Sequence, residues 1–267
     1  MQYVRLSHRA QIEAYLRSNP ELFVYSLGDL EDDLWPFTKW YAAIDAGEIH
    51  ALCLVFLKYK VPVVHAISEP DNQALFGLVS AVADQLPDFS EIHLGPAAGN
   101  ALDAHYKYSG MVDHKKMALR DHSHLDTIDT SSAEQLGPAD ITAIRDLYDA
   151  VYRDATRKNV FDPAMLDTGP YFGIREGRHL ISAAGVHVYS PRYSVAAIAN
   201  VATHPDHRGQ GLAETATARL CQELIPHVQH IGLNVAKANN PAHTAYQRIG
   251  FQSIANYREG LIHRRPT

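Results

Sequence analysis

Cysteine and long apolar runs are scarce in this sequence. Its 267 residues include only Cys53 and Cys221, too few for a disulfide framework. The longest uninterrupted apolar run, Ala51–Leu57, is far shorter than the ~20 residues that cross a membrane. The first residues also lack the apolar stretch of a secretory signal peptide. These absences predict a soluble cytoplasmic protein without a membrane partner.

An excess of basic residues is also lacking. Lys and Arg total 24 against 30 Asp and Glu, which gives a net charge of −6, and neither half of the chain is strongly basic. Because nucleic-acid binding needs a basic surface, we expect no nucleic-acid partner. The 16 histidines are unusually numerous, but they follow no metal-ligand spacing, so we predict no metal site.

What the sequence does contain is an alternation of strand and helix patterns, which predicts an α/β (α+β) fold with a mixed central sheet flanked by helices. In the C-terminal half, the patterns predict helices over 138–153, 212–225 and 241–249, and strands over 171–175, 180–189, 193–203, 230–235 and 251–263. The N-terminal half repeats this order more loosely, with strands over 3–6, 38–44, 49–58, 61–67, 91–94 and 112–119, and helices over 9–17, 20–31, 71–86 and 97–106.

The length suggests roughly two domains. The most polar segment, Asp121–Gly137, is the best candidate boundary, so we predict an N-terminal lobe over 1–124 and a C-terminal lobe over 125–267. A short echo favours duplication, because Tyr106–Met111 aligns with Tyr246–Phe251, each after an expected strand and short helix. Nothing in the sequence indicates the oligomeric state.

The segment Asn200–Ala213 (NVATHPDHRGQGLA) is the first with chemical content. It predicts a buried strand ending at Thr203, a tight loop, and a helix from about Gly211. Gly209 and Gly211 would let a ligand approach the backbone, and the free N–H groups of a helix N-terminus favour a phosphate or pyrophosphate. The loop is neither a Walker A loop nor a dinucleotide fingerprint. A plain strand-to-helix turn would explain the two glycines equally well.

A second segment, Asn239–Phe251 (NNPAHTAYQRIGF), weakens that plainer explanation. Together the two segments resemble the paired motifs of the GNAT superfamily of N-acetyltransferases, which uses acetyl-CoA. The family's first motif, Arg/Gln-x-x-Gly-x-Gly/Ala, resembles Arg208–Ala213. The resemblance covers roughly 125–267 and implies a GNAT fold there; Gly185–Phe251 also resembles the branch that contains the glycine N-acyltransferases. The second motif is met at Asn239, Ala242, Tyr246, Arg248, Gly250 and Phe251, with Ala245 in place of the usual Leu.

The resemblance implies a role for each residue of the two motifs. Loop N–H groups would hold the CoA pyrophosphate, and Arg208 would order the loop. The strand end would pair with the pantetheine arm and polarise the thioester carbonyl. Asn239 would bind the cofactor arm, and Tyr246 would protonate the departing thiolate as a general acid. The implied cofactor-binding residues are Val201, Ala202, Thr203, Arg208, Gly209, Gln210, Gly211, Leu212, Ala213, Asn239 and Tyr246.

The base that accepts the amine's proton is not evident. An alkyl ammonium has a pKa of ~10.4 and must lose a proton before it attacks. Ribosomal-protein N-acetyltransferases of this superfamily place a Glu where this chain has Asn234, which cannot act as a base. His187 or Glu259 could serve through water. Alternatively, Asn200 and Asn234 could orient a water or the acceptor amine, and we count both with Tyr246 as candidate catalytic residues.

The expected activity is an acyl-CoA-dependent N-acyltransfer, from acetyl-CoA to a primary amine of a small molecule or amino acid. Direct attack in a ternary complex is expected, because Cys221 has no activating neighbour in the sequence and fits a core residue better. The equivalent N-terminal turn, Ser68–Asn72, is acidic and lacks glycine, so the first lobe is expected to be a degenerate GNAT-like lobe that does not bind CoA. Two alternatives remain: a non-catalytic acyl-CoA-binding regulator, and an acetyltransferase of protein N-termini or lysines.

Overall fold

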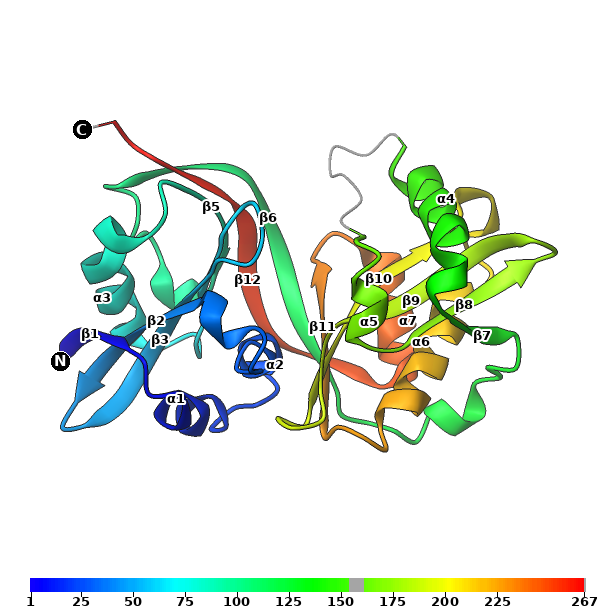
Figure 1. Cartoon of the computed structure of the whole chain (residues 1–267), viewed down its shortest axis with the longest axis horizontal. Helices are drawn as coiled ribbons and strands as arrows, with labels where there is room; N and C mark the ends of the chain where they lie inside the picture. The colour runs from blue at the N-terminus through cyan, green and yellow to red at the C-terminus, as the bar shows by residue number, and fades with distance from the viewer. Residues whose placement is uncertain (154–160, 267) are drawn as a thin grey trace. The chain divides into compact units, whose positions relative to one another are not determined.

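The structure, a computed structural model, describes residues 1–153 and 161–266, which fall into two compact units. Unit 1 contains Met1–Lys116, Val235–Ala238 and the C-terminal segment from Ile254. Unit 2 contains Met117–Asn234 and Asn239–Ser253. The chain thus ends in the unit where it began, as the positions of the two termini in Figure 1 show.

Unit 1 is built on a mixed sheet with the strand order β1-β2-β3-β4-β5-β12-β6. The pairs β1–β2, β2–β3, β3–β4 and β5–β12 are antiparallel, whereas β4 and β5 run parallel with helix α3 between them in the chain. The C-terminal strand β12 therefore completes this unit by pairing with β5. The strands are β1 (Gln2–Leu6), β2 (Thr38–Asp45), β3 (Glu48–Phe56), β4 (Val63–Ala66), β5 (Phe89–Leu94), β6 (Tyr106–Leu119) and β12 (Phe251–Arg264).

The sheet of unit 1 buries side chains on both faces. Alternate residues such as Tyr41, Cys53 and Val64 pack in one apolar cluster with α3 (Gln73–Val82). The residues between them, such as Trp40 and Leu54, face α1 (Arg9–Leu16) and α2 (Val24–Gly28). This period of two follows from the pleat of a strand. Short 3-10 turns lie at Trp35–Phe37, Ala83–Gln85 and Pro96–Ala98.

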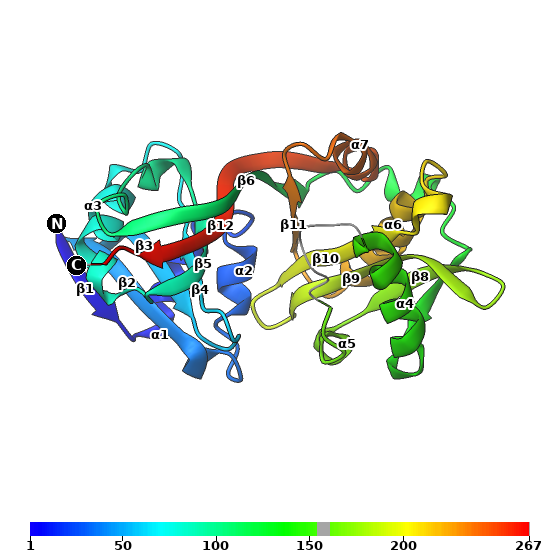
Figure 2. The same cartoon turned by 90° about the horizontal axis from the view of Figure 1, so that it is seen from above.

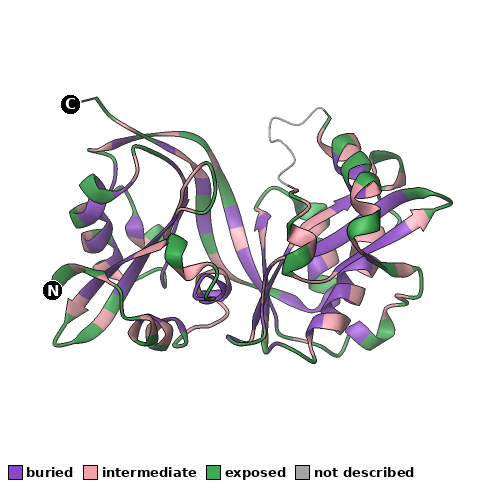
Figure 3. Ribbon diagram, viewed as in Figure 1, coloured by how far each residue is buried: buried purple, intermediate pink, exposed green. Residues whose placement is uncertain are grey.

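Unit 2 has the strand order β11-β10-β9-β8-β7, antiparallel except for the parallel pair β10 and β11. Helices α4 and α5 cover one face, and α6 and α7 cover the other (Figure 2). Buried residues gather in the strands and on the inner sides of these helices (Figure 3). The elements are β7 (Ala133–Leu136), α4 (Ile141–Tyr152), α5 (Met165–Thr168), β8 (Tyr171–Glu176), β9 (His179–Ser190), β10 (Val195–Thr203), α6 (Leu212–Leu224), β11 (His230–Ala236) and α7 (Asn240–Ile249), with 3-10 turns at Leu125–Thr127, Pro138–Asp140 and Pro205–His207.

The two units share one topology. Each begins with an edge strand followed by two helices, continues with three antiparallel strands, and then has a helix that connects the last of these to a parallel strand. The two helices after the edge strand and the connecting helix are α1, α2 and α3 in unit 1, and α4, α5 and α6 in unit 2. The predicted α/β fold with a mixed sheet and a tandem arrangement is confirmed. No helix among the described residues has the length and apolar character to cross a membrane.

Three local predictions were wrong. No helix forms over 97–106, because the 3-10 turn that begins at Pro96 ends at Gly99, whose φ is +50°. The helix expected over 20–31 is reduced to α2. The alignment of Tyr106–Met111 with Tyr246–Phe251 fails, because the first segment lies in β6 and the second spans the end of α7. The corresponding strands of the two segments are β6 and β12, which begin at Tyr106 and Phe251.

Candidate active site

The glycine loop connects β10 to α6 and leaves the start of the helix open. Gly209 and Gly211 have φ values of +77° and +79°, in the left-handed region that glycine favours. No heavy atom lies within 4 Å of the position that a Cβ would take at either glycine. Gly211 is the N-cap of α6 and provides no side chain to bind the first N–H groups. These N–H groups have no acceptor within the helix, so the loop has the donors and the space that a phosphate needs.

Strand β10 separates from its parallel neighbour before it reaches this loop. Within unit 2 the parallel ladder joins Val195–Ile198 to His230–Leu233, while β10 continues to Thr203. The antiparallel ladder with β9 is also irregular between Ala199 and Ala202. The segment Val201–Thr203 therefore has a backbone edge beyond the ladder with β11, where an extended ligand could pair with it.

Asn200 lies at this irregularity with a φ of +54°, a conformation that asparagine tolerates better than most residues. Its Nδ2 donates to the Tyr171 hydroxyl at 3.0 Å, and its backbone oxygen accepts from the Tyr148 hydroxyl at 2.6 Å. Burial raises the pKa of Tyr171 to about 12 and the pKa of Tyr148 well above its usual value, so both phenols stay protonated near neutral pH. Asn200 is thus held by two buried tyrosines.

Sequence reasoning overlooked these two tyrosines. Tyr148 comes from α4 and Tyr171 from β8, and both belong to the apolar cluster under that face of the sheet. Their positions match the apolar periodicity of their elements, so nothing in the sequence distinguished them from ordinary core residues.

Tyr246 is almost fully buried on α7 and packs edge-on against Phe251, with 6.0 Å between ring centroids. Burial raises its pKa well above the usual tyrosine value, and the neighbouring Tyr152 and Cys221 add to the effect. Its hydroxyl therefore carries a proton at neutral pH, as a general acid must. Cys221 is itself fully buried and burial raises its thiol pKa, which agrees with a core residue rather than a nucleophile.

Asn239 and Gly250 define the two ends of α7. The Oδ1 of Asn239 accepts from the Ala242 N–H at 3.3 Å as the N-cap, which leaves its Nδ2 for another partner. Gly250 ends the helix with a φ of +113°, and a Cβ there would collide with the carbonyl oxygen of Asp121. The Asn and Gly of the second motif thus have local structural roles, whatever else they bind.

The remaining predicted residues are dispersed. Arg208, Gln210 and Gly209 are exposed in the loop, and Leu212 and Ala213 form the partly buried first turn of α6. Asn234 is half-buried near the end of β11. His187 is half-buried on β9 in unit 2, whereas Glu259 belongs to unit 1, where it pairs with His93 across β12 and β5.

Comparison with known proteins finds similarity to acetyltransferases. Residues 141–251 match the acetyltransferase (GNAT) family. The structure resembles a Drosophila protein (TM-score 0.72, 12% identity, 98% of each chain covered). It also resembles a tandem GNAT protein from the clavulanic acid biosynthesis pathway (TM-score 0.58, 14% identity, 100% of this chain and 99% of the other). A GNAT-family acetyltransferase from Colwellia psychrerythraea is similar as well (TM-score 0.54, 15% identity, 100% of each chain). No curated protein matches the sequence.

Proposed function

We propose that unit 2, whose residues 141–251 match the GNAT acetyltransferase family, transfers an acyl group from acyl-CoA to a primary amine. Acetyl-CoA is the proposed donor, and a small molecule or amino acid is the proposed acceptor. The observation that carries the proposal is the open glycine loop at the start of α6. The two buried free cysteines suit a reducing compartment, and we place the protein in the cytoplasm.

The residues of the two motifs fit the parts of an acyl-CoA molecule. The N–H groups from Gly209 to Ala213 would bind the pyrophosphate, because they are unsatisfied donors at the positive end of the 13-residue helix α6. The backbone edge Val201–Thr203 would pair with the pantetheine arm, and Asn239 would bind the same arm through Nδ2. When bound, acetyl-CoA supplies the acyl group as an activated thioester.

The chain's own contribution to the chemistry is orientation and proton transfer. An N–H at the end of β10 would polarise the acyl carbonyl, as a preorganised donor does in an oxyanion hole. Tyr246 would deliver its phenolic proton to the sulfur that leaves. The amine's proton would go to a water held by Asn234 and by Asn200, whose conformation Tyr148 and Tyr171 maintain. Direct transfer follows, because the only cysteine of unit 2 is buried and protonated.

Turnover of acetyl-CoA over a panel of amines and amino acids tests this proposal. We expect CoA release that depends on the acceptor and an acetylated product of matching mass. Stoichiometric binding of acetyl-CoA without transfer to any acceptor would favour the non-catalytic regulator instead. Transfer only to peptides, at an N-terminal amine or a lysine, would replace the small-molecule acceptor with a protein.

A further inference from the structure

Unit 1 contains a group of polar side chains that the proposed acyl transfer does not use. Glu91 and His93 lie two residues apart on β5, so both point to the same face of the sheet. Glu259 on β12 is paired directly with His93, and His114 lies on β6, the neighbour of β12 in the sheet order. This face is opposite to the one covered by α3, because Ile92 and Leu94 belong to the α3 cluster. We call Glu91, His93, His114 and Glu259 the four-residue cluster.

The donor atoms of Glu91, His93 and Glu259 converge, and His114 lies next to Glu259. The Nε2 of His93 lies 3.2 Å from Oε1 of Glu91 and 3.6 Å from Oε2 of Glu259. The Nε2 of His114 lies 3.9 Å from the same Oε2 of Glu259. Coordinating atoms of Glu91, His93 and Glu259 all lie within 4.8 Å of one another. His93, His114 and Glu259 are buried, while the side chain of Glu91 is about one-third exposed, which provides a route from solvent.

The positions of the protons sharpen this picture. The Nδ1 of His114 lies 3.1 Å from the carbonyl oxygen of Val112, which can only accept, so Nδ1 carries a proton. A backbone carbonyl on the second ring nitrogen is also the usual arrangement of a histidine that ligates a metal.

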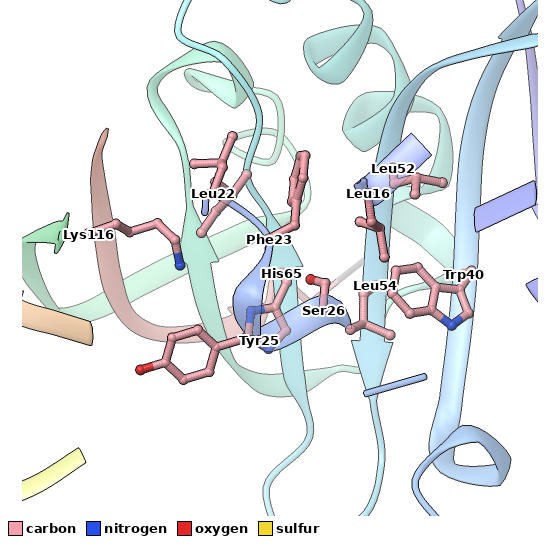
Figure 4. Close-up of a pocket in the computed structure, with 11 residues that line it drawn as sticks. Leu16, Leu22, Phe23, Tyr25, Ser26, Trp40, Leu52, Leu54, His65 and Lys116 are labelled. Atoms are coloured by element: carbon pink, nitrogen blue, oxygen red, sulfur yellow. The ribbon is translucent and has the colours of Figure 1, made fainter. Parts of the chain in front are cut away.

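Other side chains pack around the four-residue cluster, and one of them donates a hydrogen bond to the carboxylate of Glu259. The Tyr257 hydroxyl donates to Oε2 of Glu259 at 2.9 Å. The His65 ring packs edge-on against His93, with 4.6 Å between centroids. The Lys116 ammonium lies 4.8 Å from the ring centroid of Tyr25. Figure 4 shows Lys116, Tyr25 and His65 around one side of a cavity of about 20 Å³, room for about one water molecule.

We propose that the four-residue cluster binds one divalent transition-metal ion of the zinc type. Tetrahedral zinc bonds of 2.0–2.2 Å to nitrogen and oxygen place neighbouring ligand atoms about 3.4 Å apart. The observed separations of 3.2 and 3.6 Å bracket that value. Two imidazole nitrogens and two carboxylate oxygens suit zinc better than the harder Mg²⁺ or Ca²⁺. The ion would fasten the C-terminal strand β12 to β5 and β6.

This site departs from our expectation that the chain holds no metal. The ligands come from three strands, and residues 93, 114 and 259 are far apart in the sequence. The only local signal is the pair Glu91-x-His93, which is too short to distinguish a site from a solvated strand face.

The test uses the full chain after treatment with EDTA. Zn²⁺ is titrated in competition with a chromophoric chelator, and Co²⁺ is added separately to record the visible absorption of a four-coordinate site. We expect one equivalent bound and a melting temperature that rises with Zn²⁺, since binding to the folded state alone stabilises it. Glu259→Gln and His93→Gln should each weaken Zn²⁺ binding at least ~10-fold.

The matched control is His105→Gln. His105 also forms a pair with a carboxylate, at 3.1 Å from Asp84, but that pair is exposed, and the other partner of Asp84 is Arg264. Its loss should leave Zn²⁺ affinity unchanged. Glu91→Gln, at the most exposed ligand, provides a third variant if the buried ones fail to fold. Absence of stoichiometric binding would overturn the proposal. Equal affinity in the wild type and the cluster variants would do so too, because it would place the ion on other histidines.

Discussion

The two units use the same topology but finish the corresponding strand-to-helix junction in opposite ways. In unit 1 the side chain of Asn72 caps α3, accepting from the Ala74 N–H at 3.1 Å, and Glu69 and Asp71 lie in the same turn. In unit 2 Gly211 opens α6 with no side-chain cap and open space around it. A helix that caps itself and carries acidic neighbours has no place for a phosphate, whereas an uncapped one does.

The parallel strand pairs of the two units, β4–β5 and β10–β11, also differ in how far their pairing extends toward this junction. All four residues of β4, Val63–Ala66, pair with Glu91–Leu94 on β5. In unit 2 only the first four residues of β10 pair with β11, and β10 continues beyond them. The same topology thus gives a closed junction in one unit and an open junction in the other. A few residues in a turn and at a strand end are enough to make this difference.

The largest expected effect comes from Gly211→Val. A β-branched residue is strained at a φ of +79° and would occupy the space left for the pyrophosphate. We expect acetyl-CoA binding, measured by calorimetry, to be abolished. Gly177→Val is the control, because Gly177 also has a positive φ and open surroundings but lies in the β8–β9 turn. Retained affinity in a folded Gly211→Val protein would mean that CoA binds elsewhere.

Tyr246→Phe should have the next largest effect. The ring and its packing on Phe251 remain, but the proton for the leaving thiolate is lost. General acid catalysis is typically worth ~10²–10⁴-fold, so the single-turnover rate should fall by that range with little change in CoA affinity. An unaltered chemical step would exclude Tyr246 as the acid.

Tyr106→Phe in unit 1 is the matched control for that variant. The Tyr106 hydroxyl accepts from Nη2 of Arg264 at 2.6 Å and donates to the carbonyl oxygen of Ala83, at 3.1 Å. Its loss should cost about 1–3 kcal/mol of stability and leave the acyl-transfer step unchanged. The two tyrosines would then be separated experimentally into a reacting group and a structural one.

A smaller effect is expected at a buried carboxylate of unit 1. Burial raises the pKa of Asp29 to about 8, while its unfolded value is near 3.8. The folded state therefore favours the protonated form, and the stability this contributes is lost as pH rises from about 4 through 8. Asp29→Asn should raise the melting temperature by several degrees at pH 8 and much less at pH 5. The exposed Asp33→Asn serves as control, and an equal gain at both pH values would contradict the assigned shift.

The smallest effects separate two helix caps. Asn72 caps α3 and Asn239 caps α7, and both helices have ten residues. Asn72→Ala and Asn239→Ala should each cost about 1 kcal/mol of unfolding free energy in urea titrations. Only Asn239→Ala should also weaken CoA binding, because only the Nδ2 of Asn239 is proposed to bind the cofactor arm. Equal CoA affinity in both variants would limit Asn239 to capping.

The C-terminal half was predicted more accurately than the N-terminal half. Its periodic patterns are long and its motifs have definite spacing, so α6, α7 and their flanking strands were correct to within a few residues. In the N-terminal half, a helix was expected after β5, but the segment forms only a 3-10 turn at Pro96–Ala98. Short apolar and small-residue runs such as this one do not distinguish a helix from a turn, and Gly99 decided the outcome.

The candidate site was partly accessible from the sequence. The glycines and Tyr246 could be proposed from the sequence because their motifs are local. Tyr148 and Tyr171 were missed, because each contacts Asn200 from a position more than 25 residues earlier in the chain. The sequence also did not show that Glu259, one of the possible bases, belongs to unit 1, where β12 pairs with β5.

By itself, the sequence determined the α/β pattern, the glycine loop and the position of each motif within its helix or strand, because these depend on periodicity and on backbone preferences within a few residues. Only the tertiary structure decided that β12 completes unit 1, that β10 leaves its partner at Ile198, and that Glu91, His93 and Glu259 meet. Strand pairing and the convergence of side chains depend on contacts between distant segments, which no local pattern specifies.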